Sequence, residues 1–174
     1  MAMEAHVFFR GKLPTKAALA RALKELRFPL SIKPATGSLE QQSGFMPMTL
    51  GREGTGVEFA LFDGRAAIAE LAGENVALRF DRIASLRWGG DDSEMLAGLC
   101  TAAALAKLTS GVVLDEAEGE VLSADDAIGK ARENLKASVG LQATRRAGAG
   151  AADIKRYLRR SCSNAAISCS SAGF

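Results

Sequence analysis

The chain has 174 residues, 48% of them hydrophobic and 24% charged, which is typical of a globular protein with one domain. The net charge of +2 is uneven: residues 139–174 carry six basic residues and one acid, so residues 1–138 carry −3. An acidic body repels phosphates, which excludes nucleic-acid binding through the body and leaves only the basic tail for that role.

The first residues and the cysteines indicate a cytoplasmic protein. The opening MAMEAHVFFRGK lacks a basic segment followed by a long apolar one, so we expect no secretory signal. The chain has three cysteines, Cys100, Cys162 and Cys169. An odd number without the spacing of a disulfide framework indicates a reducing compartment. The apolar run at 95–108 is shorter than the about 20 residues that cross a bilayer, so we expect no membrane association.

The N-terminal segment predicts a strand, a helix and a second strand. Residues 5–10 are rich in β-forming side chains, and leucines at helical spacing predict a helix over 15–27 with Thr15 as its N-cap. Residues 30–33 predict a short strand. The polar stretch 36–44 predicts a loop that forms a mobile flap.

A hairpin is predicted next. Residues 45–50 contain Pro47, which cannot donate a ladder hydrogen bond, so we expect them to form an edge strand. Residues 57–62 alternate between two faces, which predicts the partner strand across the glycine-rich turn 51–56.

Between this hairpin and the centre of the chain we expect one helix and one strand. Residues 65–72 predict a short helix that Gly73 ends. Alternation at 76–80 predicts a strand. The alternation slips near Arg82, which predicts a bulge or a break.

The helix over 91–109 is expected to organise the fold. It is apolar almost all the way round, which predicts a buried core helix, with Asp91 as its N-cap and Gly111 as its stop. Four of its residues are predicted to be nearly fully buried: Met95, Leu99, Ala103 and Ala106.

A second hairpin and a final helix complete the body. Residues 112–114 predict a buried strand, an acidic turn follows, and residues 120–122 predict the returning strand. Ser123 is expected to cap the final helix, which has acidic residues in its first turn.

Strands cluster and helices follow, so we predict an α+β fold rather than a doubly wound sheet. The expected architecture is a mainly antiparallel sheet packed against the buried central helix (91–109) and two flanking helices, in a single domain over 1–138. Residues 139–174 form a basic, low-complexity tail that we expect to be largely disordered, and 161–174 are compatible with a coding-frame artefact.

The sequence contains no recognisable catalytic or metal-binding motif, so we expect no catalytic residue, no metal ligand and no cofactor. His6 is the only histidine, and a zinc site would need cysteines or carboxylates that folding gathers near it. The glycine-rich turns 51–56 and 89–90 lack the features of a phosphate loop. The carboxylates at 91–94 and 115–120 lack calcium-loop spacing and are interpreted as solvated turns.

One stretch carries a resemblance. The run TAAALAKLTSGVVLDEAEGEVLSADDAI (101–128) is similar to a pattern in small bacterial α+β proteins: an alanine-rich helix, a threonine–glycine turn, a Val-Val strand, an acidic hairpin and a Ser-capped helix. Some of these proteins resemble immunity proteins, which neutralise a toxin by binding it. The resemblance implies a binding function and assigns no functional residues.

Two functional hypotheses follow. The first is a non-enzymatic, immunity-like module that binds another protein, with a homodimer also compatible. Its predicted partner-binding residues lie on the expected edge strand, its turn and a neighbouring tryptophan, and core packing is the competing interpretation of the apolar ones: Phe45, Met46, Met48, Arg52, Glu53 and Trp88. The alternative is a small enzyme whose carboxylates and arginines meet only in the fold, for example Glu58, Asp81 and Arg79. A cleft with carboxylates of shifted pKa favours the enzyme, and an exposed apolar patch favours the binder.

Overall fold

The computed structural model describes residues 3–138. Its contacts divide the chain into two units, Met1–Leu135 and Lys136–Phe174, and the first holds the sheet and the helices described below. The predictions of a disordered tail over 139–174 and of a coding-frame artefact at 161–174 lie outside the described residues.

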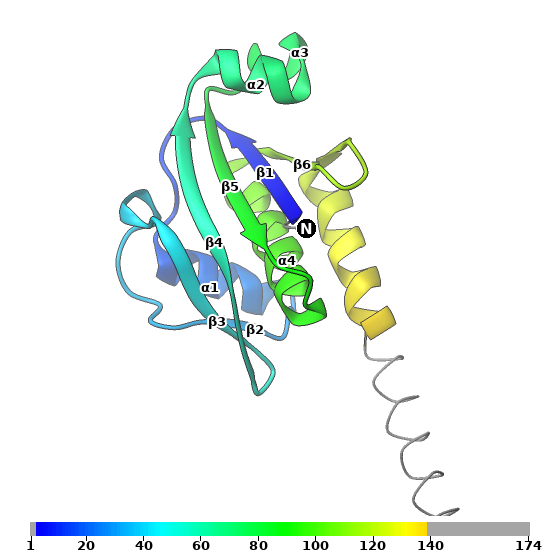
Figure 1. Cartoon of the computed structure of the whole chain (residues 1–174). Coiled ribbons are helices and arrows are strands. Elements are labelled where there is room, and N and C mark those ends of the chain that lie inside the picture. The colour runs from blue at the N-terminus through cyan, green and yellow to red at the C-terminus, as the bar shows by residue number, and fades with distance from the viewer. Residues whose placement is uncertain (1–2, 139–174) are drawn as a thin grey trace, which may run out of the picture. The chain divides into compact units, whose positions relative to one another are not determined.

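Seven strands form one sheet in which every neighbouring pair is antiparallel, in the order β2-β3-β4-β5-β1-β6-β7 (Figure 1). The predicted α+β class with an antiparallel sheet is confirmed. The strands are β1 (Met3–Phe9), β2 (Leu30–Ile32), β3 (Gly44–Leu50), β4 (Glu53–Asp63), β5 (Arg82–Trp88), β6 (Val112–Asp115) and β7 (Glu120–Ser123).

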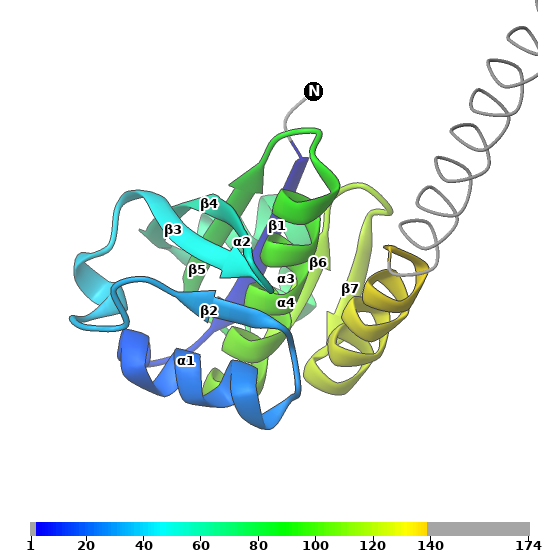
Figure 2. The same ribbon diagram turned by 90° about the horizontal axis from the view of Figure 1, so that it is seen from below.

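The helices cover the two faces of the sheet unequally. One face packs against α4 (Asp92–Thr109), and Figure 2 shows α1 (Lys16–Glu25) and a helix over 124–138 on either side of α4. The other face meets only α2 (Arg65–Ala72) and α3 (Glu74–Ala77), which lie at one end of the sheet (Figure 1). Within residues 3–138, most of this second face therefore has no helix over it.

Alternation along the strands divides the core into two clusters, because successive side chains of a strand point to opposite faces. Ala5, Val7 and Phe9 of β1 join the larger cluster, which α4 shares. Phe8 points the other way and packs with a smaller cluster under α2 and α3. The members of the smaller cluster are Phe8, Ile68, Ala77, Phe80, Ile83 and Leu114.

The ends of α4 follow from its sequence. Asp91 Oδ1 accepts a hydrogen bond from Ser93 N at 2.8 Å, so the predicted N-cap is confirmed. At the other end Ser110, with a φ of 52°, takes the left-handed position that we expected of a glycine. Gly111 has a different role, since a Cβ there would lie 2.4 Å from the Phe8 carbonyl oxygen. Glycine lets the chain pass this close to β1.

Burial along α4 matches the prediction in part. Ala103 and Ala106 are fully buried, as predicted. Met95 and Leu99 are only partly buried, so that part of the prediction is wrong. Both lie in the N-terminal half of α4 and pack against the larger cluster with part of their surface exposed.

The predicted strand at 76–80 is wrong. Residues 74–77 form α3, and Phe80 N donates to the Val76 carbonyl at 3.1 Å, a bond between residues four apart. The apolar residues of the run lie at 76, 78 and 80, so the first and the last are four positions apart, which is also the spacing along one side of a helix. Val76 and Phe80 accordingly pack on one side of the helical turn, while Leu78 is 69% exposed. The slip near Arg82 is therefore no bulge but the point where β5 begins.

Two other predicted helix boundaries are confirmed, whereas the turn predicted at 51–56 is shorter, because β4 begins at Glu53. Thr15 Oγ1 accepts from Ala18 N at 3.2 Å and caps α1, and Gly73, with a φ of 87°, ends α2. Residues 36–44 are not the free polar flap that we expected. They contain a 3₁₀ turn, η1 (Leu39–Gln41), in which Leu39 is fully buried, so the segment is anchored to the body.

Candidate functional site

The uncovered face of the sheet gathers polar side chains that the sequence scatters over more than a hundred positions. We call this the open face: the side opposite α4, formed by alternate residues of β1, β3, β4 and β5 together with the β6–β7 turn. Its members that matter below are Glu4, His6, Phe45, Glu58, Phe62, Ser85, Arg87 and Glu116.

A row of charges crosses the open face. Phe45 of β3 lies opposite Glu58 of β4, Glu58 opposite Arg87 of β5, and Arg87 opposite Glu4 of β1. Arg87 Nε also forms an ion pair with Glu4 Oε1. Because the Arg87 side chain is 61% exposed, this ion pair adds little to the stability of the fold. Along the row the charges alternate: negative at Glu58, positive at Arg87 and negative at Glu4.

A buried histidine lies beside this row. His6 Nε2 is 2.8 Å from Glu116 Oε1 and 3.6 Å from Glu4 Oε2. The imidazole is 6% exposed and stacks on Phe8 with ring centroids 6.4 Å apart, and its Nδ1 has no hydrogen-bond partner within residues 3–138. Folding thus supplies Glu116, whereas Glu4 lies two residues before His6 and on the same side of β1.

Two neighbouring pockets open on this face. One, of about 470 Å³, is lined by Phe45, Gly56, Glu58, Arg87, Trp88 and Glu94 among others. The other, of about 340 Å³, is lined by Glu4, Glu58, Phe62, Ser85 and Arg87 among others. Glu58 and Arg87 belong to both pockets, so the charged row forms the ridge between them.

The open face has an apolar residue at each side of the charged row. Phe45 is 54% exposed and Phe62 is 52% exposed, which is high for side chains of this size. The Phe45 ring rests on Gly56, where a Cβ would lie 2.3 Å from Phe45 Cζ. Phe62 was not among the predicted partner-binding residues, although the alternation of 57–62 already placed it on the same face as Glu58.

Three of the predicted partner-binding residues are buried. Met46, Met48 and Trp88 are 0%, 2% and 5% exposed and belong to the core on the α4 side. Their side chains point to the face that α4 covers. β3 is also not the edge strand that we expected, because β2 pairs with its second half, with Ile32 opposite Met48.

The other three predicted residues are exposed. Phe45 lies on the open face, and Arg52 and Glu53 lie at the β3–β4 turn. Burial removes Met46 and Met48 from any surface that a partner touches directly and leaves Trp88 only a small part of the lining of one pocket, described above.

The residues named for the enzyme alternative do not meet. Glu58 lies opposite Arg87, whereas Asp63, five positions further along β4, lies opposite Arg82, next to Asp81. Five strand residues span roughly 16 Å. Arg79 instead covers the Phe80 ring at 5.1 Å, and Asp81 pairs with Arg10 at 4.0 Å.

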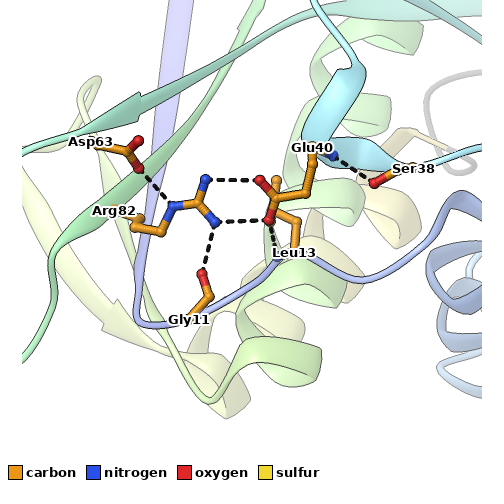
Figure 3. Close-up of polar contacts among 6 residues, drawn as sticks. All are labelled: Gly11, Leu13, Ser38, Glu40, Asp63 and Arg82. Atoms are coloured by element: carbon orange, nitrogen blue, oxygen red, sulfur yellow. Dashed lines mark hydrogen bonds and ion pairs between the residues drawn. The ribbon is translucent and has the colours of Figure 1, made fainter.

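Arg82 holds a second polar cluster, shown in Figure 3. Its Nη1 and Nη2 donate to Glu40 Oε1 and Oε2 at 2.7 and 2.8 Å, its Nε to Asp63 Oδ1 at 2.7 Å, and its Nη1 also to the Gly11 carbonyl at 2.8 Å. Leu13 N donates to the same Glu40 carboxylate at 2.6 Å.

The hydrogen bonds of this cluster stabilise the fold. The hydrogen bonds from Arg82 lower the pKa of Glu40 to about 2, and those with Glu40 raise the pKa of Arg82. The guanidinium also lies 5.4 Å from the centre of the Phe9 ring. The bonds join η1, the loop after β1 and the end of β4, so we interpret the cluster as a clamp that holds η1 to the sheet.

Cys100 is a core residue. It is fully buried in α4, and burial raises the pKa of its thiol to about 12. A thiol in this environment stays protonated at neutral pH and is a poor nucleophile.

Comparison with known proteins assigns no function, so a functional assignment depends on the geometry of the open face. No family model, no curated protein and no solved structure matches this chain. Over the part of the chain that the structure describes, no helix has the length and apolar character needed to span a membrane.

Proposed function

We propose that this chain is a non-enzymatic module that binds another protein through its open face. The observation that carries the proposal is the pair of half-exposed phenylalanines, Phe45 and Phe62, on the two sides of the charged row Glu58–Arg87–Glu4. Interfaces commonly have this composition, with aromatic anchors beside charges that fix orientation.

The apolar part supplies a driving force for association. Covering a phenylalanine that is half exposed removes enough apolar surface to contribute about 1 kcal/mol or more per ring. The shallow pockets next to Phe45 and Phe62 give a partner's side chains a place to pack. Aromatic anchors next to pockets are typical of the residues that dominate binding energy.

The charged part indicates what kind of partner fits. In the charged row and beside His6, three carboxylates (Glu4, Glu58 and Glu116) accompany one guanidinium, Arg87. A partner with basic side chains between apolar ones complements this face. Two copies of the chain would oppose acidic surface to acidic surface, which favours a different protein over a homodimer.

An immunity-like role is the finer form of this proposal. A protein that neutralises a toxin by binding needs no catalytic group, and a basic surface is common in proteins that act on nucleic acids. The resemblance of 101–128 to immunity-like proteins supports this direction, and the acidic open face is compatible with it.

The proposal is tested with matched variants of exposed apolar residues. A partner is captured from the source cell with the tagged chain, and its affinity is measured for Phe45→Asp, Phe62→Asp and Leu108→Asp. Leu108 is 41% exposed but lies on α4, on the other side of the sheet, so it controls for a general effect of removing exposed apolar surface.

We expect each phenylalanine variant to weaken binding by about 2 kcal/mol or more, roughly thirtyfold, because anchors of this kind dominate interface energy. Leu108→Asp should bind as the parent does. Equal binding by all folded variants, or loss with Leu108→Asp alone, would refute the open face as the binding surface.

A further inference from the structure

We propose that Glu4, His6 and Glu116 form a binding site for a divalent metal ion, with Zn²⁺ as the ion that fits best. This site goes beyond the proposed partner binding and does not depend on it. It combines a buried imidazole with two carboxylates, one of them from the β6–β7 turn, 110 positions away in the sequence.

The spacing of the three donors suits a small metal ion. The donor atoms all lie within 4.8 Å of one another, with Nε2–O separations of 2.8 and 3.6 Å. Zn–N and Zn–O bonds of about 2.0–2.2 Å place neighbouring ligands of a tetrahedral site roughly 3.3–3.6 Å apart. The separation of 3.6 Å lies at the upper end of this range and that of 2.8 Å lies below it, so small side-chain movements bring the donors into place.

The hydrogen bonding of His6 also points to a cation. Two carboxylates converge on one imidazole nitrogen, but Nε2 carries at most one hydrogen, which serves Glu116 and leaves Glu4 Oε2 without a donor from the ring. A metal ion at this point binds all three groups at once. The bond to Glu116 places the ring hydrogen on Nε2, and zinc binding would move this hydrogen to Nδ1, which has no partner within the described residues and can take it.

The surroundings orient the donors and leave one side open. Arg87 binds Glu4 through Oε1 and thereby turns Oε2 toward His6, as an outer group does around many metal sites. His6 is 7% and Glu4 17% exposed at the side chain, whereas Glu116 is 41% exposed. The ion would reach the site from the Glu116 side, where water completes its coordination.

Zinc is favoured over magnesium and calcium by the donor set. Imidazole with carboxylates is a ligand combination that zinc accepts, whereas magnesium and calcium prefer oxygen ligands alone. Three protein ligands and an open position resemble the zinc sites that keep a water molecule.

The single histidine of the chain makes a direct test possible. In a tag-free full-length chain, the imidazole C–H resonances in proton NMR belong to His6 alone. A background in which Cys162 and Cys169 are serine removes the two thiols that lie outside the described residues. Zn²⁺ is added to this protein, and its stoichiometry and affinity are measured in parallel by calorimetry.

We expect one Zn²⁺ per chain, a shift of the His6 resonances that saturates with it, and at least a tenfold loss of affinity in His6→Gln and in Glu116→Gln. Glu120→Gln removes an exposed carboxylate from the neighbouring strand β7 and should bind zinc as the parent does. If His6→Gln does not fold, Glu116→Gln still decides, because Glu116 lies exposed in a turn.

Three results would overturn the proposal. The parent fails to bind Zn²⁺ at millimolar concentration, or the His6 resonances do not respond while zinc binds elsewhere on the acidic surface. The third is equal zinc affinity in the parent and in Glu116→Gln. Each would indicate that His6 and its two carboxylates form only a hydrogen-bonded cluster.

Discussion

Replacing Glu40 by glutamine tests whether the clamp around Arg82 holds η1 to the sheet. The change keeps the shape of the side chain but removes the charge that accepts two hydrogen bonds from Arg82 and one from Leu13 N. Arg82 still donates hydrogen bonds to Asp63 and to the Gly11 carbonyl, so the guanidinium loses part of its hydrogen bonding and keeps the rest.

The pKa of Glu40 sets the size of the effect. A lowering from its ordinary value of 4.5 to about 2 corresponds to roughly 3 kcal/mol of stability at neutral pH. Solvent screens part of this, because the Glu40 side chain is 30% exposed and that of Arg82 is 18% exposed. We therefore expect Glu40→Gln to lower the free energy of unfolding by about 1.5 kcal/mol.

The sign of the pH dependence follows from the direction of the pKa change. A carboxyl whose pKa is lower in the folded chain contributes its full stability above its unfolded pKa and loses it as the pH falls toward the folded one. The stability gap between parent and Glu40→Gln should thus be full at about pH 7 and narrow between about pH 5 and pH 3. Urea unfolding followed by fluorescence of Trp88, the single tryptophan, measures it.

Glu53→Gln is the matched control, since Glu53 is an exposed glutamate at the β3–β4 turn. It should leave the free energy of unfolding within about 0.5 kcal/mol of the parent. A gap for Glu40→Gln that stays constant with pH, or that vanishes at pH 7, would refute the clamp.

The remaining predictions concern packing around α4. Gly98→Ala should cost about 1–3 kcal/mol, because a Cβ there would lie 2.4 Å from the Trp88 ring, and this clash outweighs the about 1 kcal/mol that alanine gains in helix propensity. Gly129→Ala, in the helix over 124–138 with nothing within 4 Å of the added Cβ, should instead be neutral or stabilising. Leu99→Ala should cost about 1–2 kcal/mol, less than a fully buried leucine, because Leu99 is only partly buried. Urea unfolding followed by far-ultraviolet circular dichroism measures all three, and equal stability of Gly98→Ala and Gly129→Ala would contradict the packing described for Trp88.

Local signals in the sequence predicted much of the fold. Thr15 and Asp91 cap the helices that periodicity indicated, and both hairpins form where glycine-rich or acidic turns separate apolar strands. The error at 76–80 has a local cause as well, since alternation over five residues also fits one helical turn. A short alternating pattern of apolar residues with no turn signal inside it does not distinguish a strand from a helical turn.

The candidate site depends on pairing that no local pattern reports. Alternation in 57–62 separates Phe59 from Phe62, but only the position of α4 decides that Phe59 is buried and Phe62 exposed. Met46 and Met48 were misplaced for the same reason. His6 and Glu116 meet because β1 pairs with β6, an adjacency that follows from the order of strands in the completed sheet.

The central claim is that a partner protein covers the open face, and site-specific photo-crosslinking tests it most directly. A photoreactive amino acid replaces Phe62 in one chain and Leu108 in another, and both are irradiated in the source cell. We predict a crosslink of defined mass to another protein from position 62 and none to the same protein from position 108. Crosslinks from position 108 alone, or from neither position in chains that fold, would contradict the account.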